Sequence, residues 1–237
     1  MSAPDFCAAL RAASAPVIAE VKPFSPAAGD LIGGRSVSEI ATAYARAGVP
    51  CVSVTTGQWH GGTPAMIADL AATGLPVLRK DFIVSRSHLE ESARWGASAV
   101  LLTCTLLRPR DLARLAALAL DLGLTPFVEA ASAAELEGLS LPEGAVLAVN
   151  NRNIRQRETD GGGIERSLSL RSMARRVQPQ GLLVSASGIT RPEQATQVLA
   201  AGFDGVLIGT ALMGDGQSDP EATARAFLAA ARQALPV

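Results

Sequence analysis

Val17-Ile18-Ala19-Glu20-Val21-Lys22 is a short apolar run that ends in ionisable residues, and Leu78-Arg79-Lys80-Asp81-Phe82 repeats this arrangement further along the chain. In each stretch a predicted strand gives way to a loop where the charged residues lie. The strand ends of a repeating β/α protein meet on one face, so we expect Glu20, Lys22 and Lys80 to lie close together. Burying a charge costs free energy unless it is paired or used, and three such residues among apolar neighbours therefore indicate a functional site.

Eight short apolar runs divide the chain at intervals of about 20 to 35 residues, with amphipathic stretches between them. This alternation predicts an α/β protein, a single (β/α)8 TIM barrel over residues 1–237 with a shortened amino-terminal extension. A doubly wound open sheet is the alternative, but eight successive units and the absence of an early G-x-G-x-x-G favour closure. The expected strands are Val17–Val21, Cys51–Val54, Val77–Arg79, Ala99–Leu102, Pro126–Glu129, Val146–Val149, Leu182–Ser185 and Gly205–Ile208.

Three of the intervening stretches carry helix start and stop signals. Ser36-x-x-Glu39 has the capping-box spacing and leads to a stop at Gly48, and Thr190-x-x-Glu193 leads in the same way to Gly202. Pro109 suits the first turn of a helix. The apolar residues that follow it on one helix face, before Gly123, are Leu112, Leu115, Ala119 and Leu122.

The charge balance and the cysteines narrow the class of protein. With 21 Lys and Arg against 22 Asp and Glu, the net charge of -1 gives no general attraction to nucleic acid or to an anionic membrane, so neither is expected as a partner.

The three cysteines, Cys7, Cys51 and Cys104, are odd in number and widely spaced, which argues against a disulfide framework or a zinc cluster. Cys51 and Cys104 are expected to be buried. No run resembles a membrane span or a signal peptide, which favours a cytoplasmic location.

Glycines follow the seventh and eighth expected strands, where many barrels bind phosphate. Gly188 and Gly209 would let backbone N–H groups approach an anion, and a short helix beginning near Thr210 would point its positive end inward. Ser25 and Lys22, in the first loop, are expected to close this phosphate site from the neighbouring side. The alternative is that both glycines only permit tight turns.

Six strings of residues, most of them at strand ends, run in a fixed order across nearly the whole chain. They are Ile18–Pro26, Ser53–Thr56, Pro76–Phe82, Val128–Glu129, Val149–Asn153 and Ser187–Ile189. Together they resemble the indole-3-glycerol phosphate synthase family, the barrel enzymes of the tryptophan pathway. The strings L-R-K-D-F and N-N-R-N are highly specific, whereas S-G-I and I-G-T are shared with other phosphate-binding barrels.

The resemblance implies a carbon–carbon lyase, a carboxy-lyase that needs no metal and no redox cofactor. Its substrate would be a small phosphorylated molecule, 1-(2-carboxyphenylamino)-1-deoxyribulose 5-phosphate. Ring closure, decarboxylation and dehydration of this molecule give indole-3-glycerol phosphate. The chemistry needs an acid at the ketone oxygen, a cation near the carboxylate and a base for the dehydration.

The resemblance also assigns roles to individual residues. Lys80 would be the general acid that protonates the carbonyl, and Lys22 would hold the carboxylate and help to expel the hydroxyl. Glu129 would serve the proton transfers of the dehydration, with Glu20 in its network. By the same likeness Asn150, Arg152 and Ser187 would orient these groups, and Ser25, Gly188, Gly209 and Thr210 would hold the phosphate.

Several positions depart from the family pattern, and they cluster on the expected catalytic face. Ala186 stands where the family usually has Glu, Ala27-Ala28 interrupts the usual S-P-S-K-G of the first loop, and Ala131 stands where His is usual. The loop Thr55–Gly61 differs from the usual Leu-Thr start. Only 16 residues precede Val17, so we expect the extra helix that covers the site in this family to be missing, or to be replaced by a protein partner.

Other interpretations stay open. A specialised paralogue acting on a related arylamine-sugar adduct in a secondary pathway would explain the departures. A non-catalytic subunit that binds a phosphorylated metabolite or another protein is the alternative from a different class, although the costly polar groups at strand ends count against it. On that alternative, Glu20 with Lys22 and Arg152 with Glu129 would be ordinary ion pairs.

Five other residues near these strings are given less direct roles. Asp81 is expected to cap a loop, and His60 and His88 are expected to be non-catalytic. Trp59 and Phe82 are candidates for stacking on an aromatic substrate, although Phe82 fits the core equally well.

Overall fold

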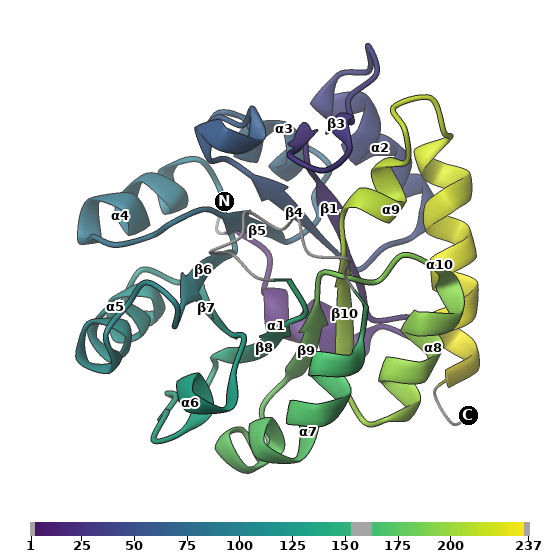
Figure 1. The fold of residues 1–237 in the computed structure, drawn as a ribbon. Coiled ribbons are helices and arrows are strands. Elements are labelled where there is room, and N and C mark those ends of the chain that lie inside the picture. Colours follow the sequence, from purple (N-terminus) through teal and green to yellow (C-terminus); the bar gives the residue numbers. More distant parts are fainter. Residues whose placement is uncertain (1–2, 153–162, 235–237) are drawn as a thin grey trace.

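The computed structural model describes residues 3–152 and 163–234, and within them eight parallel strands form a closed barrel (Figure 1). The strands are β1 (Val17–Val21), β4 (Cys51–Thr55), β5 (Val77–Lys80), β6 (Ala99–Thr103), β7 (Thr125–Ala130), β8 (Val146–Asn150), β9 (Leu183–Ala186) and β10 (Gly205–Ile208). Their order round the barrel is β1-β10-β9-β8-β7-β6-β5-β4, and β1 pairs with both β10 and β4 to close it. The predicted barrel is confirmed, and each predicted strand lies within one residue of an observed one at either end.

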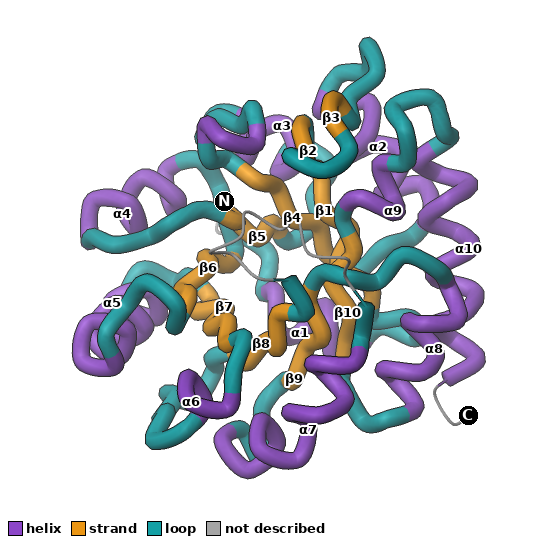
Figure 2. The backbone as a smooth tube through the Cα atoms, viewed as in Figure 1, coloured by secondary structure: helices purple, strands orange, loops and turns teal. Residues whose placement is uncertain are grey.

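Helices cover the outside of the barrel, and those between β1 and β10 connect successive strands (Figure 2). They are α2 (Val37–Ala47), α3 (Met66–Ala71), α4 (Arg86–Arg94), α5 (Pro109–Asp121), α6 (Ala133–Leu136), α7 (Glu165–Val177), α8 (Pro192–Ala200) and, after β10, α9 (Thr210–Met213) and α10 (Pro220–Ala234). The loops after β1 and β4 carry the short hairpin β2 (Phe24–Ser25) and β3 (Gly29–Asp30) and the 3-10 helix η1 (Gln58–His60). None of the helices in the described part of the chain has the length and apolarity needed to cross a membrane.

The predicted start of α2 is confirmed. The Ser36 hydroxyl accepts from the Glu39 N–H, and the Glu39 carboxylate accepts in return from the Ser36 N–H. Gly48 ends the helix at φ 89°, a left-handed conformation that glycine adopts without strain. Pro109 likewise occupies the first turn of α5, as its fixed φ favours.

The predicted capping box of α8 is wrong in its register. Pro192 takes the first helical position, so Arg191 rather than Thr190 is the N-cap. Gln194, rather than Glu193, then returns its side-chain oxygen to the N–H groups of Thr190 and Arg191. The proline therefore fixes the start of the helix where two candidate caps compete.

Successive side chains of each strand point in opposite directions, one into the barrel and the next outward toward the helices. The inward rows include Ile18 of β1, Cys51 of β4, Leu78 of β5 and Phe127 of β7, all fully buried in one apolar cluster. The outward rows pack against the helices in a second, larger cluster. Because the alternation continues to the strand ends, the inward rows deliver their last residues to the mouth of the barrel.

A helix that the sequence pattern did not predict, α1 (Phe6–Ala12), closes the amino-terminal end of the barrel. Its Phe6 and Leu10 are buried in the inward-facing cluster, with the Phe6 and Phe127 ring centroids 6.3 Å apart. Figure 1 shows α1 inside the ring of strands. Asp5 caps the helix by accepting from the N–H of Ala8. The amino-terminal segment described in the structure therefore packs at the end of the barrel opposite to Lys22 and Lys80.

We expect Phe6→Ala to lower the free energy of unfolding by about 3–5 kcal/mol, because it removes a fully buried ring and leaves a cavity. Denaturant unfolding of the purified variant measures this loss. Phe24→Ala is the control, since the Phe24 ring is 41% exposed. If the two variants lose equal stability, α1 does not contribute to the core in this way.

Candidate active site

Polar side chains continue the inward rows at the carboxyl ends of the strands. Just beyond the last apolar inward residue, β1 carries Glu20, β5 carries Lys80, β7 carries Glu129 and β8 carries Asn150. Lys22 lies two residues beyond Glu20 on the same row. All five side chains are buried. The structure thus brings together residues that separate sequence strings predicted.

The polar side chains form two groups, one around Glu20 and one around Glu129. Glu20 Oε2 lies 3.7 Å from Lys80 Nζ and accepts from the Ser53 hydroxyl at 3.5 Å. On the other side of the barrel mouth, Asn150 Nδ2 donates to Glu129 Oε1 at 2.8 Å. Opposite charges that are buried together compensate part of the cost of removing each from water. The site therefore holds the Glu20–Lys80 pair on one side of the barrel mouth and the Asn150–Glu129 pair on the other.

Lys22 and Lys80 are the only lysines in the chain, and every other basic residue is an arginine. An arginine guanidinium keeps its proton at any ordinary pH, whereas a lysine ammonium releases one. The only two lysines of this arginine-rich chain therefore occupy buried positions at the barrel mouth, where they are the basic side chains able to release a proton. The rarity of lysine is visible in the sequence itself and is a signal for both positions.

A first cavity of about 20 Å³ lies beside Lys80 and Glu129. Its remaining wall is formed by Thr55, Trp59, His60, Asp81, Phe82 and Leu101. The Trp59 and Phe82 rings stack at 12°, with centroids 5.8 Å apart. This side of the barrel mouth is therefore aromatic and apolar, apart from the charged groups at its inner edge.

A second cavity of about 140 Å³ lies on the Glu20 side of the Glu20–Lys80 pair. The residues that line it are Glu20, Lys22, Arg152, Ser187, Gly188, Ile189, Thr190, Gly209, Thr210 and Ala211. Arg152 is held at its backbone, where its N–H donates to Asn150 Oδ1 at 2.8 Å. The first N–H groups of a helix have no partner within it, and α9 begins at Thr210 on this wall. Two basic side chains and these N–H groups make the cavity suitable for an anion.

The two glycines of this wall are required for different reasons. A Cβ at Gly209 would lie 2.5 Å from Glu20 Oε1, so the glycine makes room for the carboxylate. Gly188 has φ 72°, and a Cβ there would meet the Gly163 carbonyl oxygen and Asn151 Cβ. The turn explanation therefore applies to Gly188, whereas Gly209 permits the close approach of a charged group.

Ser187 is held in a strained conformation beside the second cavity. Its φ of 63° is the only positive value for a non-glycine residue in the described part of the chain, and such strain often marks a functional site. Asn151 holds the turn, because its Nδ2 donates to Ser185 Oγ, the Ala186 carbonyl and the Ser187 carbonyl at 3.0–3.2 Å. Its Oδ1 accepts from the Ser167 N–H at 2.9 Å. Asn151 lies within the N-N-R-N string but was not predicted as a site residue.

We expect Asn151→Ala to cost about 2–4 kcal/mol of stability, because several buried polar groups lose their partner at once. Thermal and denaturant unfolding measure the loss. Ser167→Ala, which removes one hydroxyl from the same cluster and keeps Asn151, is expected to cost less. A loss no greater in Asn151→Ala than in Ser167→Ala would contradict this role for Asn151.

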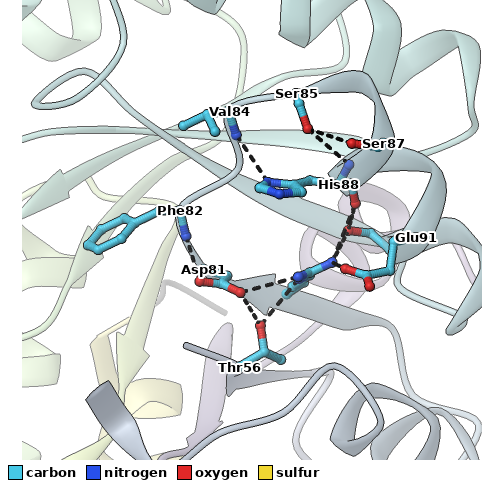
Figure 3. A network of polar contacts seen from close by, with 10 residues as sticks. Thr56, Asp81, Phe82, Val84, Ser85, Ser87, His88 and Glu91 are labelled. Atoms are coloured by element: carbon cyan, nitrogen blue, oxygen red, sulfur yellow. Dashed lines mark hydrogen bonds and ion pairs between the residues drawn. The ribbon is translucent and has the colours of Figure 1, made fainter. Parts of the chain in front are cut away.

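Arg79 alternates with the inward-facing Leu78 and Lys80, so its side chain faces outward, where it joins β5 to α4. Its guanidinium donates to Glu91 Oε2 at 2.7 Å, to Asp81 Oδ2 at 3.2 Å and to Thr56 Oγ1 at 3.2 Å. Asp81 also accepts from the Thr56 hydroxyl and from the Phe82 N–H, both at 2.8 Å, and Figure 3 shows it between these two groups. The predicted capping role of Asp81 is confirmed, and the network fixes the end of β5, which carries Lys80, and the loop after it, which carries Phe82.

Three further residues differ from what their sequence positions indicated. Ser25 is buried in β2 but is not among the described residues that line either cavity. His60, which lies outside the family strings, is buried in the wall of the first cavity, where its Nδ1 lies 3.0 Å from the Phe24 carbonyl oxygen, and its expected non-catalytic role stays a prediction. Cys104 is only partly buried, because β6 ends at Thr103 and the cysteine lies in the turn that follows. Burial raises the pKa of Cys104 to about 12, with the Glu135 carboxylate adding to the effect, so its thiol stays protonated at neutral pH.

A family model described as indole-3-glycerol phosphate synthase matches residues 2–227. Indole-3-glycerol phosphate synthase 2 of Streptomyces coelicolor is 39% identical over 227 residues, which covers 94% of this chain and 84% of that protein. Indole-3-glycerol phosphate synthase of Thermococcus kodakarensis is 38% identical over 199 residues, which covers 83% of this chain and 86% of that protein.

Solved structures with much lower sequence identity share the fold. A tryptophan synthase alpha-subunit from Pyrococcus furiosus superposes with a TM-score of 0.68 at 13% identity, covering 91% of this chain and 98% of that one. A tryptophan synthase structure from M. tuberculosis gives a TM-score of 0.65 at 17% identity, covering 95% of each chain. At these identities the likeness is one of barrel architecture alone.

Proposed function

Because the chain belongs to the indole-3-glycerol phosphate synthase family, we propose that it converts 1-(2-carboxyphenylamino)-1-deoxyribulose 5-phosphate to indole-3-glycerol phosphate, with release of CO2 and water. The observation that carries the proposal is the Glu20–Lys80 pair, which lies between an aromatic-walled cavity and an anion-binding cavity. The Trp59 and Phe82 rings that line the first cavity suit stacking against an anthranilate ring, and the second cavity suits a phosphate.

Ring closure is the first step. A bond forms between the ring carbon that bears the carboxylate and the ketone carbon, and Lys80 gives a proton to the ketone oxygen. Lys22 holds the carboxylate, which then leaves as CO2 while its bonding electrons restore the aromatic ring. A proton donor inside an enclosed site acts on the developing charge without competition from water. The burial of Lys80 supports this role.

Dehydration is the second step. The ring nitrogen pushes out the hydroxyl group, which takes a proton from a lysine ammonium and leaves as water. Glu129 removes the proton from the neighbouring carbon, which completes the indole. The 2.8 Å hydrogen bond from Asn150 to Glu129 orients this base. Gly188, Gly209, Thr210 and Ser187 would hold the phosphate during both steps, and Arg152 would complete the charge around it.

Turnover of this one substrate by the purified protein tests the proposal. Indole fluorescence that rises with time, and that depends on protein concentration, is the expected result. Tight binding of the adduct without any indole would instead favour the non-catalytic subunit that binds a phosphorylated metabolite.

Ala186 favours a second candidate, a paralogue that acts on a related arylamine-sugar adduct. Its side chain is fully buried on the inward row of β9 and pairs in register with Asn150. A glutamate is usual here in the family, so Lys22, Lys80 and Arg152 have one fewer carboxylate nearby and the site is more positive. Weaker electrostatic balance at the reacting groups predicts low turnover of the standard adduct.

We expect Ala186→Glu to raise the turnover of the standard adduct by about tenfold, because it restores one interaction of about 1.4 kcal/mol with the reacting groups. Steady-state kinetics measure the change. Ala186→Gln is the matched control, which adds similar bulk without the charge and is expected to give no gain. A wild-type turnover number on the order of 1 to 10 per second would contradict the impairment.

A cytoplasmic location is proposed with this function, because the three cysteines are unpaired in the structure, as is usual in a reducing compartment. A protein partner over the mouth of the barrel stays a prediction. The loops after β1, β5 and β6 present Phe24, Val84 and Leu106 to solvent, and such exposed apolar side chains suit a protein contact.

A further inference from the structure

Thr55, the last residue of β4, carries a buried hydroxyl group without a partner. The residue is 1% exposed, and in the part of the chain that the structure describes its Oγ1 makes no hydrogen bond. The other two hydroxyl groups at this strand end are used, since Ser53 bonds to Glu20 and Thr56 bonds to Asp81. A buried hydroxyl without a partner is costly, and valine has the same shape without that cost. Thr55 therefore calls for an explanation.

The Thr55 side chain faces the first cavity. It lies two residues beyond Ser53, whose side chain points inward to Glu20, so the alternation of the strand directs Thr55 to the barrel mouth. Thr55 lines this cavity together with the aromatic side chains Trp59 and Phe82 and the reacting groups Lys80 and Glu129. The cavity of about 20 Å³ has room for one water-sized group.

We propose that Thr55 is a specificity-determining residue that binds a hydroxyl substituent on the aromatic ring of the substrate. This inference rests on the proposed function, because it places the arylamine ring of the substrate against the aromatic wall of the first cavity. A ring that lies against Phe82 and Trp59 would direct its edge toward Thr55, where a hydroxyl fits the water-sized space and satisfies the unpaired group. The preferred substrate class is then a ring-hydroxylated 2-carboxyphenylamino deoxyribulose phosphate, and the product is a hydroxyindole.

A site that pairs a buried polar group with the substrate discriminates against an analogue that lacks this partner. For one neutral hydrogen bond we expect a preference of about tenfold to a hundredfold. In the Thr55→Val variant the wall keeps its shape but loses the hydroxyl, so the preference is expected to disappear.

Binding of unreactive adducts tests the inference separately from catalysis. The probes are adducts in which the ketone is reduced to an alcohol, one with the plain ring and the others with a single hydroxyl at each free ring position. Dissociation constants are measured by calorimetry for the wild type, Thr55→Val and Thr103→Val. Thr103 is the matched control, because it also ends a barrel strand, is buried, and has a hydroxyl that already accepts from the Thr105 N–H.

We expect that one hydroxylated adduct binds the wild type and Thr103→Val at least about tenfold more tightly than the plain adduct does. For Thr55→Val, we expect the same hydroxylated adduct to bind no more tightly than the plain adduct. Equal or weaker binding of every hydroxylated adduct to the wild type would overturn the inference and would indicate that an ordered water satisfies Thr55. A preference that survives in Thr55→Val would overturn it as well.

Turnover of the corresponding ketones separates this inference from the proposed function. If the wild type prefers a hydroxylated adduct in binding but closes no ring, the proposed function fails and the role of Thr55 in recognition stands. If the plain ketone is converted with a kcat/KM equal to or above that of every hydroxylated ketone, the function stands and the inference falls.

Discussion

Lys80→Met is expected to lower the turnover of the phosphorylated adduct by at least about 10²-fold, the usual cost of losing a general acid. The methionine keeps the length of the side chain and leaves the ketone oxygen without a proton donor. Lys80 is buried, 3.7 Å from Glu20, and lines the cavity that also contains Glu129. Single-turnover fluorescence measurements at saturating adduct follow indole formation on the enzyme without a contribution from product release.

Lys80→Arg separates proton donation from ion pairing. If Lys80 served only to pair with Glu20, arginine would preserve the charge and most of the activity. A guanidinium does not release its proton near neutral pH, so on the proposed mechanism Lys80→Arg remains as impaired as Lys80→Met. Unchanged circular dichroism and thermal unfolding in both variants control for misfolding. Near-normal turnover in either variant would remove Lys80 from the mechanism.

The strands were predictable because buried parallel strands are short, nearly continuous apolar runs. The charged groups were predictable because they interrupt or follow these runs. Period-two alternation then places Glu20 and Lys80 on inward rows, as the structure shows. The helix α1 was missed because its role depends on the open end of the barrel, where Phe6 meets Phe127 from a distant strand. No local pattern contains that contact.

Contacts across the barrel mouth were also beyond local pattern. The three bonds from Asn151 to the turn at Ser187 depend on the pairing of β8 with β9, so a sequence string alone shows a polar residue and not its target. The hydroxyl of Thr55, which makes no hydrogen bond to any residue that the structure describes, likewise shows only in three dimensions. Gly209 was predicted to bind phosphate because it follows a strand. The structure adds a second reason for glycine at this position, which is that a Cβ would lie too close to the Glu20 carboxylate.

Gly209→Ala is expected to reduce kcat/KM for the phosphorylated adduct by about 10²-fold. The added Cβ would lie 2.5 Å from Glu20 Oε1, so the carboxylate, the backbone of the turn or both must move. Movement of the turn displaces the start of α9 and the wall of the second cavity. One or two charge-assisted hydrogen bonds to phosphate, each worth about 1.5–3 kcal/mol, are enough to account for a loss of this size.

The phosphate contribution is isolated by comparing phosphorylated and dephosphorylated forms of the reduced adduct in a binding assay. Gly209→Ala is expected to weaken the phosphorylated form far more, because the dephosphorylated form makes no use of the second cavity. Gly205→Ala, at the opposite end of β10, is the control, since its Cβ would approach no atom nearer than the Pro16 carbonyl oxygen at 3.2 Å. Equal weakening of both forms by Gly209→Ala would mean that the glycine serves the placement of Glu20 and not the binding of phosphate.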